Sequence, residues 1–160
     1  MFVCVCAPLQ PSIVPFAPAS ILKLSFGPDV RLSELGTTLT PRTVAQRPRV
    51  NYNVHANRYY VVAMFDPDAP SRATPIFAQW LHWLMVNVPG RDLSRGDTLV
   101  EYVGAAPPEG SGMHRYIVAV FEQSKKIDME SQLKINRTTS VTTSARMVLS
   151  CRGAACRAGI

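Results

Sequence analysis

The sequence predicts a single domain of mainly β structure, and two observations carry this prediction. Residues 59–65, 80–88 and 114–123 are apolar segments rich in β-branched and aromatic side chains, as is typical of buried strands. Shorter segments that alternate between polar and apolar residues precede them, and Pro and Gly clusters separate them. A chain of 160 residues can bury one sizeable core. We expect one domain over residues 1–160, with atypical or poorly ordered ends at 1–12 and 150–160.

The first third of the chain predicts short strands and one short helix. Residues 19–26 alternate between polar and apolar side chains, which predicts a half-buried strand. Residues 30–35 and 49–54 predict two further short strands. Between them, the Thr-Pro pair at 40–41 has the pattern of a helix start, and Pro48 limits this helix to about two turns.

The three long apolar segments predict the centre of a sheet. Residues 59–65 are apolar at every position, so both faces of this strand should be covered. Residues 80–88 end at a Pro-Gly turn, and residues 114–123 follow a loop rich in Gly and Pro. If the outer two strands run antiparallel to the first, the end of the first strand and the starts of the other two meet at one rim of the sheet.

Polar and aromatic side chains gather at this expected rim. Asp66 follows the first strand, and alternation along a strand places Trp80 with His82, and His114 with Tyr116. Protonated imidazoles can hold a phosphate oxygen, while a carboxylate or an indole face can meet an ammonium group. A lone histidine on an apolar strand is more often a satisfied core residue, but two of them beside aromatic rings favour a binding site.

Three motifs occur in order along the chain: Asp66-Pro-Asp-Ala-Pro-Ser-Arg72, Trp80-x-His82-Trp83, and Gly104-x-x-Pro-Pro-x-Gly-x-Gly-x-His-Arg-Tyr116. With this spacing the sequence resembles the animal-type phosphatidylethanolamine-binding proteins, which include the Raf kinase inhibitor proteins. The resemblance extends from about residue 13 to about residue 149. It implies a phosphatidylethanolamine-binding-protein-like fold, in which a central antiparallel sheet is packed by a second, smaller sheet with a few short helices.

The resemblance also implies a function: non-catalytic binding of phosphorylated head groups such as phosphorylethanolamine, and modulation or inhibition of kinase signalling through a Raf-like protein kinase. Some members inhibit serine proteases, which is the alternative. Carried over by position, the ligand-binding residues are Asp66, Trp80, His82, Gly104, Pro107, Pro108, His114 and Tyr116. Asp68 and Arg72 match the motif as structural supports, and an ion pair with Asp68 is one role for Arg72.

The sequence departs from the family pattern in two places. Ala106 stands where animal members usually have a second glycine, which puts the loop conformation in question if that residue needs a positive φ. Residues 136–149 still resemble the helix that follows the core of the family, but from Ser150 onward the pattern is lost. A missing edge strand there would expose unpaired backbone.

An enzyme is the less favoured interpretation. Asp66, His82 and His114 resemble the ligands of a metal-dependent hydrolase. However, the chain has no HExxH motif or P-loop, and Ser71 lacks a nucleophile elbow. The four cysteines at the two ends do not have the spacing of a zinc ribbon. We expect no catalytic activity, no metal and no cofactor.

The formal net charge of +6 is compatible with acidic partners such as phosphate groups and with peripheral contact with an anionic membrane surface, but its thin spread along the chain favours a solvated basic surface. Only one basic pair occurs, at 125–126, so nucleic-acid binding has little support. The short apolar segment at 1–7 lacks the charged start of a secretory signal. These features predict a cytoplasmic protein; secretion by a signal not visible in this sequence is the alternative.

Overall fold

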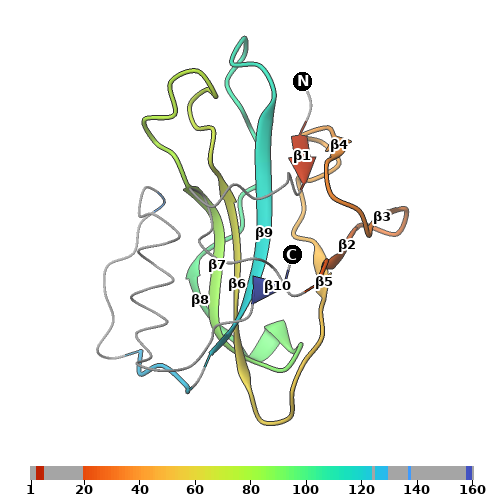
Figure 1. Ribbon diagram of the computed structural model, residues 1–160, viewed down its shortest axis with the longest axis vertical. Helices are drawn as coiled ribbons and strands as arrows, with labels where there is room; N and C mark the ends of the chain where they lie inside the picture. The colour runs from red at the N-terminus through yellow and green to blue at the C-terminus, as the bar shows by residue number, and fades with distance from the viewer. Residues whose placement is uncertain (1–2, 6–19, 124, 130–136, 138–157, 160) are drawn as a thin grey trace.

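The protein was analysed as a computed structural model, which describes residues 3–5, 20–123, 125–129, 137 and 158–159 (Figure 1). Its elements are β1 (Val3–Val5), β2 (Lys23–Phe26), β3 (Val30–Leu32), β4 (Thr37–Leu39), β5 (Arg49–Asn51), β6 (Tyr59–Asp66), β7 (Trp80–Pro89), the 3-10 helix η1 (Leu93–Arg95), β8 (Asp97–Val100), β9 (His114–Gln123) and β10 (Ala158–Gly159). A seven-stranded sheet has the order β4-β1-β9-β6-β7-β8, with β10 beside β9, and a three-stranded sheet has the order β3-β2-β5. The predicted mainly β fold with a large and a small sheet is confirmed.

Strand β6 is the centre of the large sheet. It pairs antiparallel with β7 on one side and with β9 on the other. Its two faces belong to two separate hydrophobic clusters, so both are covered, as predicted from its uninterrupted apolar sequence. The face towards the small sheet carries Tyr60, Val62 and Met64, and the opposite face carries Val61, Ala63 and Phe65.

The small sheet covers one face of the large sheet. Leu22, Leu24 and Phe26 are buried against the cluster that contains Tyr60, whereas Ile21 and Lys23 are exposed. This alternation confirms the predicted half-buried strand. Burying such side chains between two sheets is the main source of stability for the arrangement.

The expected helix after Thr40 is wrong. The structure has a succession of turns there, in which Thr43 N and Val44 N donate to Thr40 O. In a helix, Val44 O would accept from the N–H of residue 48, which is a proline and has none. Instead Val44 is fully buried and its carbonyl accepts from the hydroxyl of Tyr102, at 2.6 Å. Tertiary contacts therefore replace the helical bonds.

Five elements were not predicted from the sequence: β1 and β10 near the two ends of the chain, and β4, β8 and η1. Strands β4 and β8 are short and half-polar, so neither periodicity nor composition marks them. The 3-10 helix η1 is one turn long, and Asp92 caps it by accepting from Ser94 N at 3.1 Å.

The ends of the chain meet β9. Strand β1 pairs parallel with the start of β9, and β10 pairs antiparallel with Val120 and Phe121 further along it. Most of the segments 1–12 and 150–160, and of the helix expected at 136–149, lies outside the described residues. Within the part of the chain that the structure describes, no helix is long and apolar enough to cross a membrane.

Candidate functional site

The antiparallel pairing around β6 assembles a polar rim at one end of the large sheet. Asp66 at the end of β6 lies opposite Trp80 at the start of β7, and Phe65 lies opposite Ile117 near the start of β9. The loops that follow β6 and precede β9 project together from this end (Figure 1). Residues far apart in the sequence are thus brought to one place by strand register alone.

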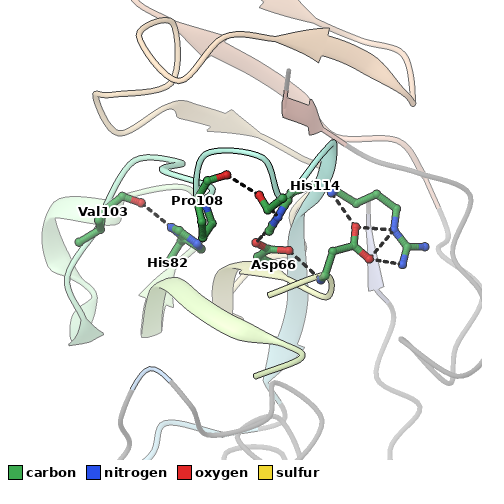
Figure 2. A network of polar contacts seen from close by, with 8 residues as sticks. Asp66, His82, Val103, Pro108 and His114 are labelled. Atoms are coloured by element: carbon green, nitrogen blue, oxygen red, sulfur yellow. Dashed lines mark hydrogen bonds and ion pairs between the residues drawn. The ribbon is translucent and has the colours of Figure 1, made fainter. Parts of the chain in front are cut away.

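A continuous chain of hydrogen bonds lies at the centre of the rim (Figure 2). The Nδ1 atom of His114 is 2.7 Å from Asp66 Oδ2, and its Nε2 atom is 3.0 Å from Ser111 Oγ. The Ser111 hydroxyl donates to Pro108 O at 2.6 Å, so the imidazole meets an acceptor at both nitrogens. Asp66 and His114 are only 3% and 1% exposed, which makes this a buried, preorganised set.

His82 reaches the same rim through an irregularity in β7. Between the pairs Met64–Trp83 and Phe65–Leu81 the register shifts, which leaves His82 as the extra residue of a β-bulge. Its ring packs edge-on against Tyr116, with 5.1 Å between centroids. The Tyr116 ring also stacks with the imidazole of His114, with 6.4 Å between the ring centroids. Tyr116 therefore lies between the two imidazoles.

The proton on His82 is held by the loop that precedes β9. Its Nδ1 atom lies 2.9 Å from Val103 O, and a ring that donates from Nδ1 presents a lone pair at Nε2 when neutral. Burial lowers the pKa of His82, and hydrogen bonding to backbone carbonyls together with the charge of Asp66 offsets only part of this effect. At neutral pH we therefore treat His82 as neutral.

The pKa values of the Asp66 carboxyl and of the Tyr116 phenol shift in the same direction. Burial raises the pKa of Asp66, although hydrogen bonds from His114 and from the backbone N–H of Asp68 oppose the increase. Burial, and secondarily the charge of Asp66 and a hydrogen bond to that carboxylate, raises the pKa of Tyr116, so its hydroxyl stays protonated and donates to Asp66. The rim thus combines acceptors, donors and a proton-accepting imidazole among buried side chains.

Asp68 belongs to a separate contact. Its carboxylate accepts from Nε and from one terminal nitrogen of Arg115, the shortest contact being 2.6 Å, and from the Arg115 backbone N–H at 2.8 Å. Burial alone would raise its pKa, but the hydrogen bonds from Arg115 outweigh this and the pKa is lowered. The ion pair proposed between Arg72 and Asp68 is therefore wrong: Arg115 takes that place, and Arg72 is exposed and acts through its charge.

The remaining expected site residues lie around this centre. Trp80 is half-buried, with its ring edge-on to Phe77 at 6.2 Å. Pro107 is buried and Pro108 is exposed, in the loop that carries Ser111. Gly104 approaches the turns after Thr40 so closely that a Cβ there would lie 2.9 Å from Val44 O. This contact requires glycine. Ala106 does not adopt a positive φ, so its side chain does not disturb the loop.

Sequence reasoning missed several contributors. Ser111 lies in a Gly-rich motif in which nothing distinguishes it from its neighbours, yet it bonds to His114. Arg115 lies between His114 and Tyr116 in the sequence, but its side chain is on the other face of β9, where it bonds to Asp68. Arg137 was not foreseen at all: it donates to the backbone carbonyls of Leu81 and Glu101, at 3.2 and 3.1 Å, and its charge also lowers the pKa of His82. No local pattern marks such a distant arginine.

Large apolar side chains that are exposed to solvent border the rim. Ile76 and Phe77 lie in the loop after β6, and Val103 and Met113 lie in the loop before β9. All four are exposed, Ile76 at 76%. Exposed apolar residues gathered around a polar site are typical of a surface that contacts a partner.

The side chains at the rim do not form a metal centre. Among the residues that the structure describes, no group of three or more His, Cys, Asp or Glu side chains could hold a metal ion. Asp66 and His114 instead bond to each other, and His82 bonds to a carbonyl through Nδ1. Two packed sheets with a preorganised polar rim define a mainly β domain with a candidate ligand site at one end of its large sheet.

Comparisons with known proteins agree with this class. The profile of the phosphatidylethanolamine-binding protein family matches residues 25–148. The "Putative odorant-binding protein A5" of Drosophila melanogaster is 38% identical over 122 residues, which is 76% of this chain and 58% of that protein. This chain thus spans less than two thirds of the length of that relative. The protein belongs to the phosphatidylethanolamine-binding protein family.

Solved structures share the fold. A carboxypeptidase Y inhibitor complexed with its cognate proteinase has a TM-score of 0.74 at 24% identity, covering 86% of this chain and 83% of the inhibitor's. A phosphatidylethanolamine-binding protein from Plasmodium vivax has a TM-score of 0.64 at 20% identity, covering 86% and 84%. At this level of identity the likeness concerns the fold alone.

Proposed function

We propose that this protein is a non-catalytic binding protein whose rim, formed by Asp66, His82, Ser111, His114 and Tyr116, binds phosphate groups carried by small amines, as in phosphorylethanolamine or a phospholipid head group. The observation that carries the proposal is the hydrogen-bonded set around Asp66 and His114, with His82 nearby. Family membership supports it. The rim holds and orients a ligand and breaks no bond.

The chemistry of the rim fits a zwitterionic ligand. A phosphate oxygen would accept from Nε2 of His82 once that ring gains a proton, and from the Tyr116 hydroxyl in exchange for its bond to Asp66. The ammonium group would lie towards the carboxylate of Asp66 or the half-buried ring of Trp80, both of which attract cations. The net charge of +6 would add a general attraction for the anion.

The protein partner we propose is a Raf-like protein kinase, whose signalling this protein would modulate or inhibit in the cytoplasm. The exposed side chains of Ile76, Phe77, Val103 and Met113 supply an apolar surface around the ligand site, suited to a protein partner or to peripheral contact with a membrane. Ligand and partner would then compete for adjacent surfaces.

Serine protease inhibition is the second candidate. The observation that favours it is the fold shared with a carboxypeptidase Y inhibitor that was solved together with its proteinase. Adding the purified protein to a panel of proteases distinguishes the two: stoichiometric inhibition of a protease with no effect on a kinase would favour this candidate.

The binding proposal is tested by calorimetric titration with phosphorylethanolamine. We expect saturable binding that His82→Gln weakens at least about tenfold, because a hydrogen bond to a charged group contributes about 1.5–3 kcal/mol. His114→Ala removes a fully buried ring, so Ser111→Ala is the milder second variant. His55→Ala is the matched control, since His55 is exposed and pairs with Glu122 at 2.6 Å. Binding that all these variants retain would overturn the proposal.

A further inference from the structure

A polar cavity lies at the opposite end of the molecule from the rim. It is found where β2 and β5 meet the turn that follows β7, and it has a volume of about 220 Å³. In Figure 1 this turn lies at the bottom of the view, near η1, whereas the loops of the rim are at the top. The two sites therefore do not share residues.

Strand pairing and a clamp of hydrogen bonds build this cavity. Lys23 on β2 lies opposite Asn51 on β5, and both are on the exposed side of the small sheet. The chain continues into Tyr52, whose hydroxyl donates to Gly90 O at 2.7 Å and whose carbonyl accepts from Nε of Arg91. These two bonds fix Arg91 beside the small sheet.

The lining of the cavity is cationic and rich in donors. It comprises Lys23, Arg91, Asn51, Asn53, Ser20 and the buried Tyr52, together with the exposed Ile21 at the mouth. Burial raises the pKa of Tyr52, so the phenol is uncharged. None of the lining residues is acidic. The adjacent carboxylate of Asp92 is engaged with Ser94.

The guanidinium group of Arg91 is held in an orientation that suits an anion. Its Nε is bonded to Tyr52 O, which orients the planar guanidinium and leaves both terminal nitrogens without a partner among the described residues. The same is true of the ammonium group of Lys23 and of the carboxamides of Asn51 and Asn53. A fixed guanidinium fork and a nearby ammonium match the geometry and the charge of a tetrahedral dianion.

We propose that this cavity, which we call the Lys23–Arg91 cavity, is a second binding site for the phosphate dianion, free or carried as a monoester on a small soluble molecule. Its volume admits a phosphate group with a small carrier. The proposal is independent of the function proposed for the rim.

The test is an NMR titration of the full chain in the His82→Gln background, so that the rim does not contribute. Inorganic phosphate is added while the side-chain signals of Asn51, Asn53 and Arg91 Nε are followed. We expect saturable shifts at these signals, and Lys23→Ala or Arg91→Ala should weaken binding at least tenfold. Phosphoserine as a second ligand distinguishes free phosphate from a monoester: tighter binding than inorganic phosphate assigns the monoester.

Two comparisons make the result decisive. Arg95→Ala removes one positive charge four positions along the chain from Arg91 without altering the lining of the cavity, and it should leave the phosphate affinity nearly unchanged. Arg91→Lys retains the charge if Arg91→Ala fails to fold, and Lys23 lies on an exposed strand face where truncation preserves the fold. The proposal is overturned if no saturable shift occurs at these signals, or if Arg95→Ala weakens binding as much as Lys23→Ala.

Discussion

Two aspartates that lie two positions apart, Asp66 at the end of β6 and Asp68 in the turn beyond it, bond to side chains on opposite faces of β9. Asp66 bonds to His114, and Asp68 bonds to Arg115, the next residue of β9. Both carboxylates are almost fully buried, but their pKa values shift in opposite directions: burial dominates at Asp66, and the guanidinium bonds dominate at Asp68. The negative charge of Asp66 is therefore only partly compensated by its neighbours, whereas that of Asp68 is fully compensated.

The difference has a functional meaning. Asp68 is charged, neutralised by a permanent cation and bonded to a backbone N–H, which is the arrangement of a structural support. Asp66 bonds to the His114 imidazole, to the backbone N–H of Asp68 and to the Tyr116 hydroxyl rather than to a permanent cation, so its charge can attract the ammonium group of a ligand. Mutations should therefore affect stability at one aspartate and binding at the other.

The largest effect is expected for Asp68→Ala. It leaves the largely buried guanidinium of Arg115 without its carboxylate, and breaking such a pair costs about 3–5 kcal/mol. Urea denaturation should show this loss in the free energy of unfolding. Arg72→Ala is the control, because Arg72 is exposed, and it should change stability by less than about 0.5 kcal/mol. An Asp68→Ala protein as stable as the wild type would show that Asp68 is not a structural support.

The complementary change is Asp66→Asn. The amide oxygen can still accept from His114 Nδ1, so the free energy of unfolding should stay within about 1 kcal/mol of the wild-type value. The affinity for phosphorylethanolamine should fall about tenfold, because the charged acceptor for the ammonium group and for the imidazole is lost. Calorimetric titration measures this, and an unchanged affinity would exclude Asp66 from the ligand site.

Sequence reasoning succeeded where the chain itself dictates the answer. Strands β6, β7 and β9 follow from long apolar segments whose bounds are visible in the sequence, and antiparallel pairing of the three brings Asp66, His82 and His114 to one end. Alternation then placed His114 and Tyr116 on a common face. These predictions needed only local composition and the period of a strand.

The rest depended on contacts that no local pattern encodes. The bulge that aims His82 at Tyr116 is a register shift between two strands. Arg115 was missed as the partner of Asp68 because the two are 47 positions apart and Arg72 was nearer in sequence. The chain after Thr40 forms turns and not the expected helix, since the carbonyl of Val44 accepts a hydrogen bond from the Tyr102 hydroxyl. Long-range partners decided each case.

A smaller effect is expected in the pH dependence of ligand affinity, through His82. Burial holds the pKa of His82 below its ordinary value, so the ring is neutral in the free protein at pH 7. A bound phosphate favours the protonated ring, so binding takes up a proton and affinity should rise as pH falls from 8 to 6, by less than tenfold per unit. Below about pH 6 the phosphate itself gains a proton and the rise ends. Calorimetry in two buffers of different ionisation enthalpy measures the proton uptake, which His82→Gln should abolish.

The smallest effect is in the pH dependence of stability, where the two aspartates should act in opposite directions. The pKa of Asp68 is lowered on folding, so its contribution is present above about pH 3.8 and is lost as pH falls through its folded-state pKa. The pKa of Asp66 is raised, so the folded state binds its proton more tightly, and stability is lost as pH rises from about 3.8 through the folded-state pKa. Urea denaturation between pH 3 and pH 7 should therefore show that Asp66→Asn gains relative to the wild type as pH rises, whereas Asp68→Asn loses. Parallel curves for the two variants would mean that both carboxylates are compensated to the same extent by their neighbours.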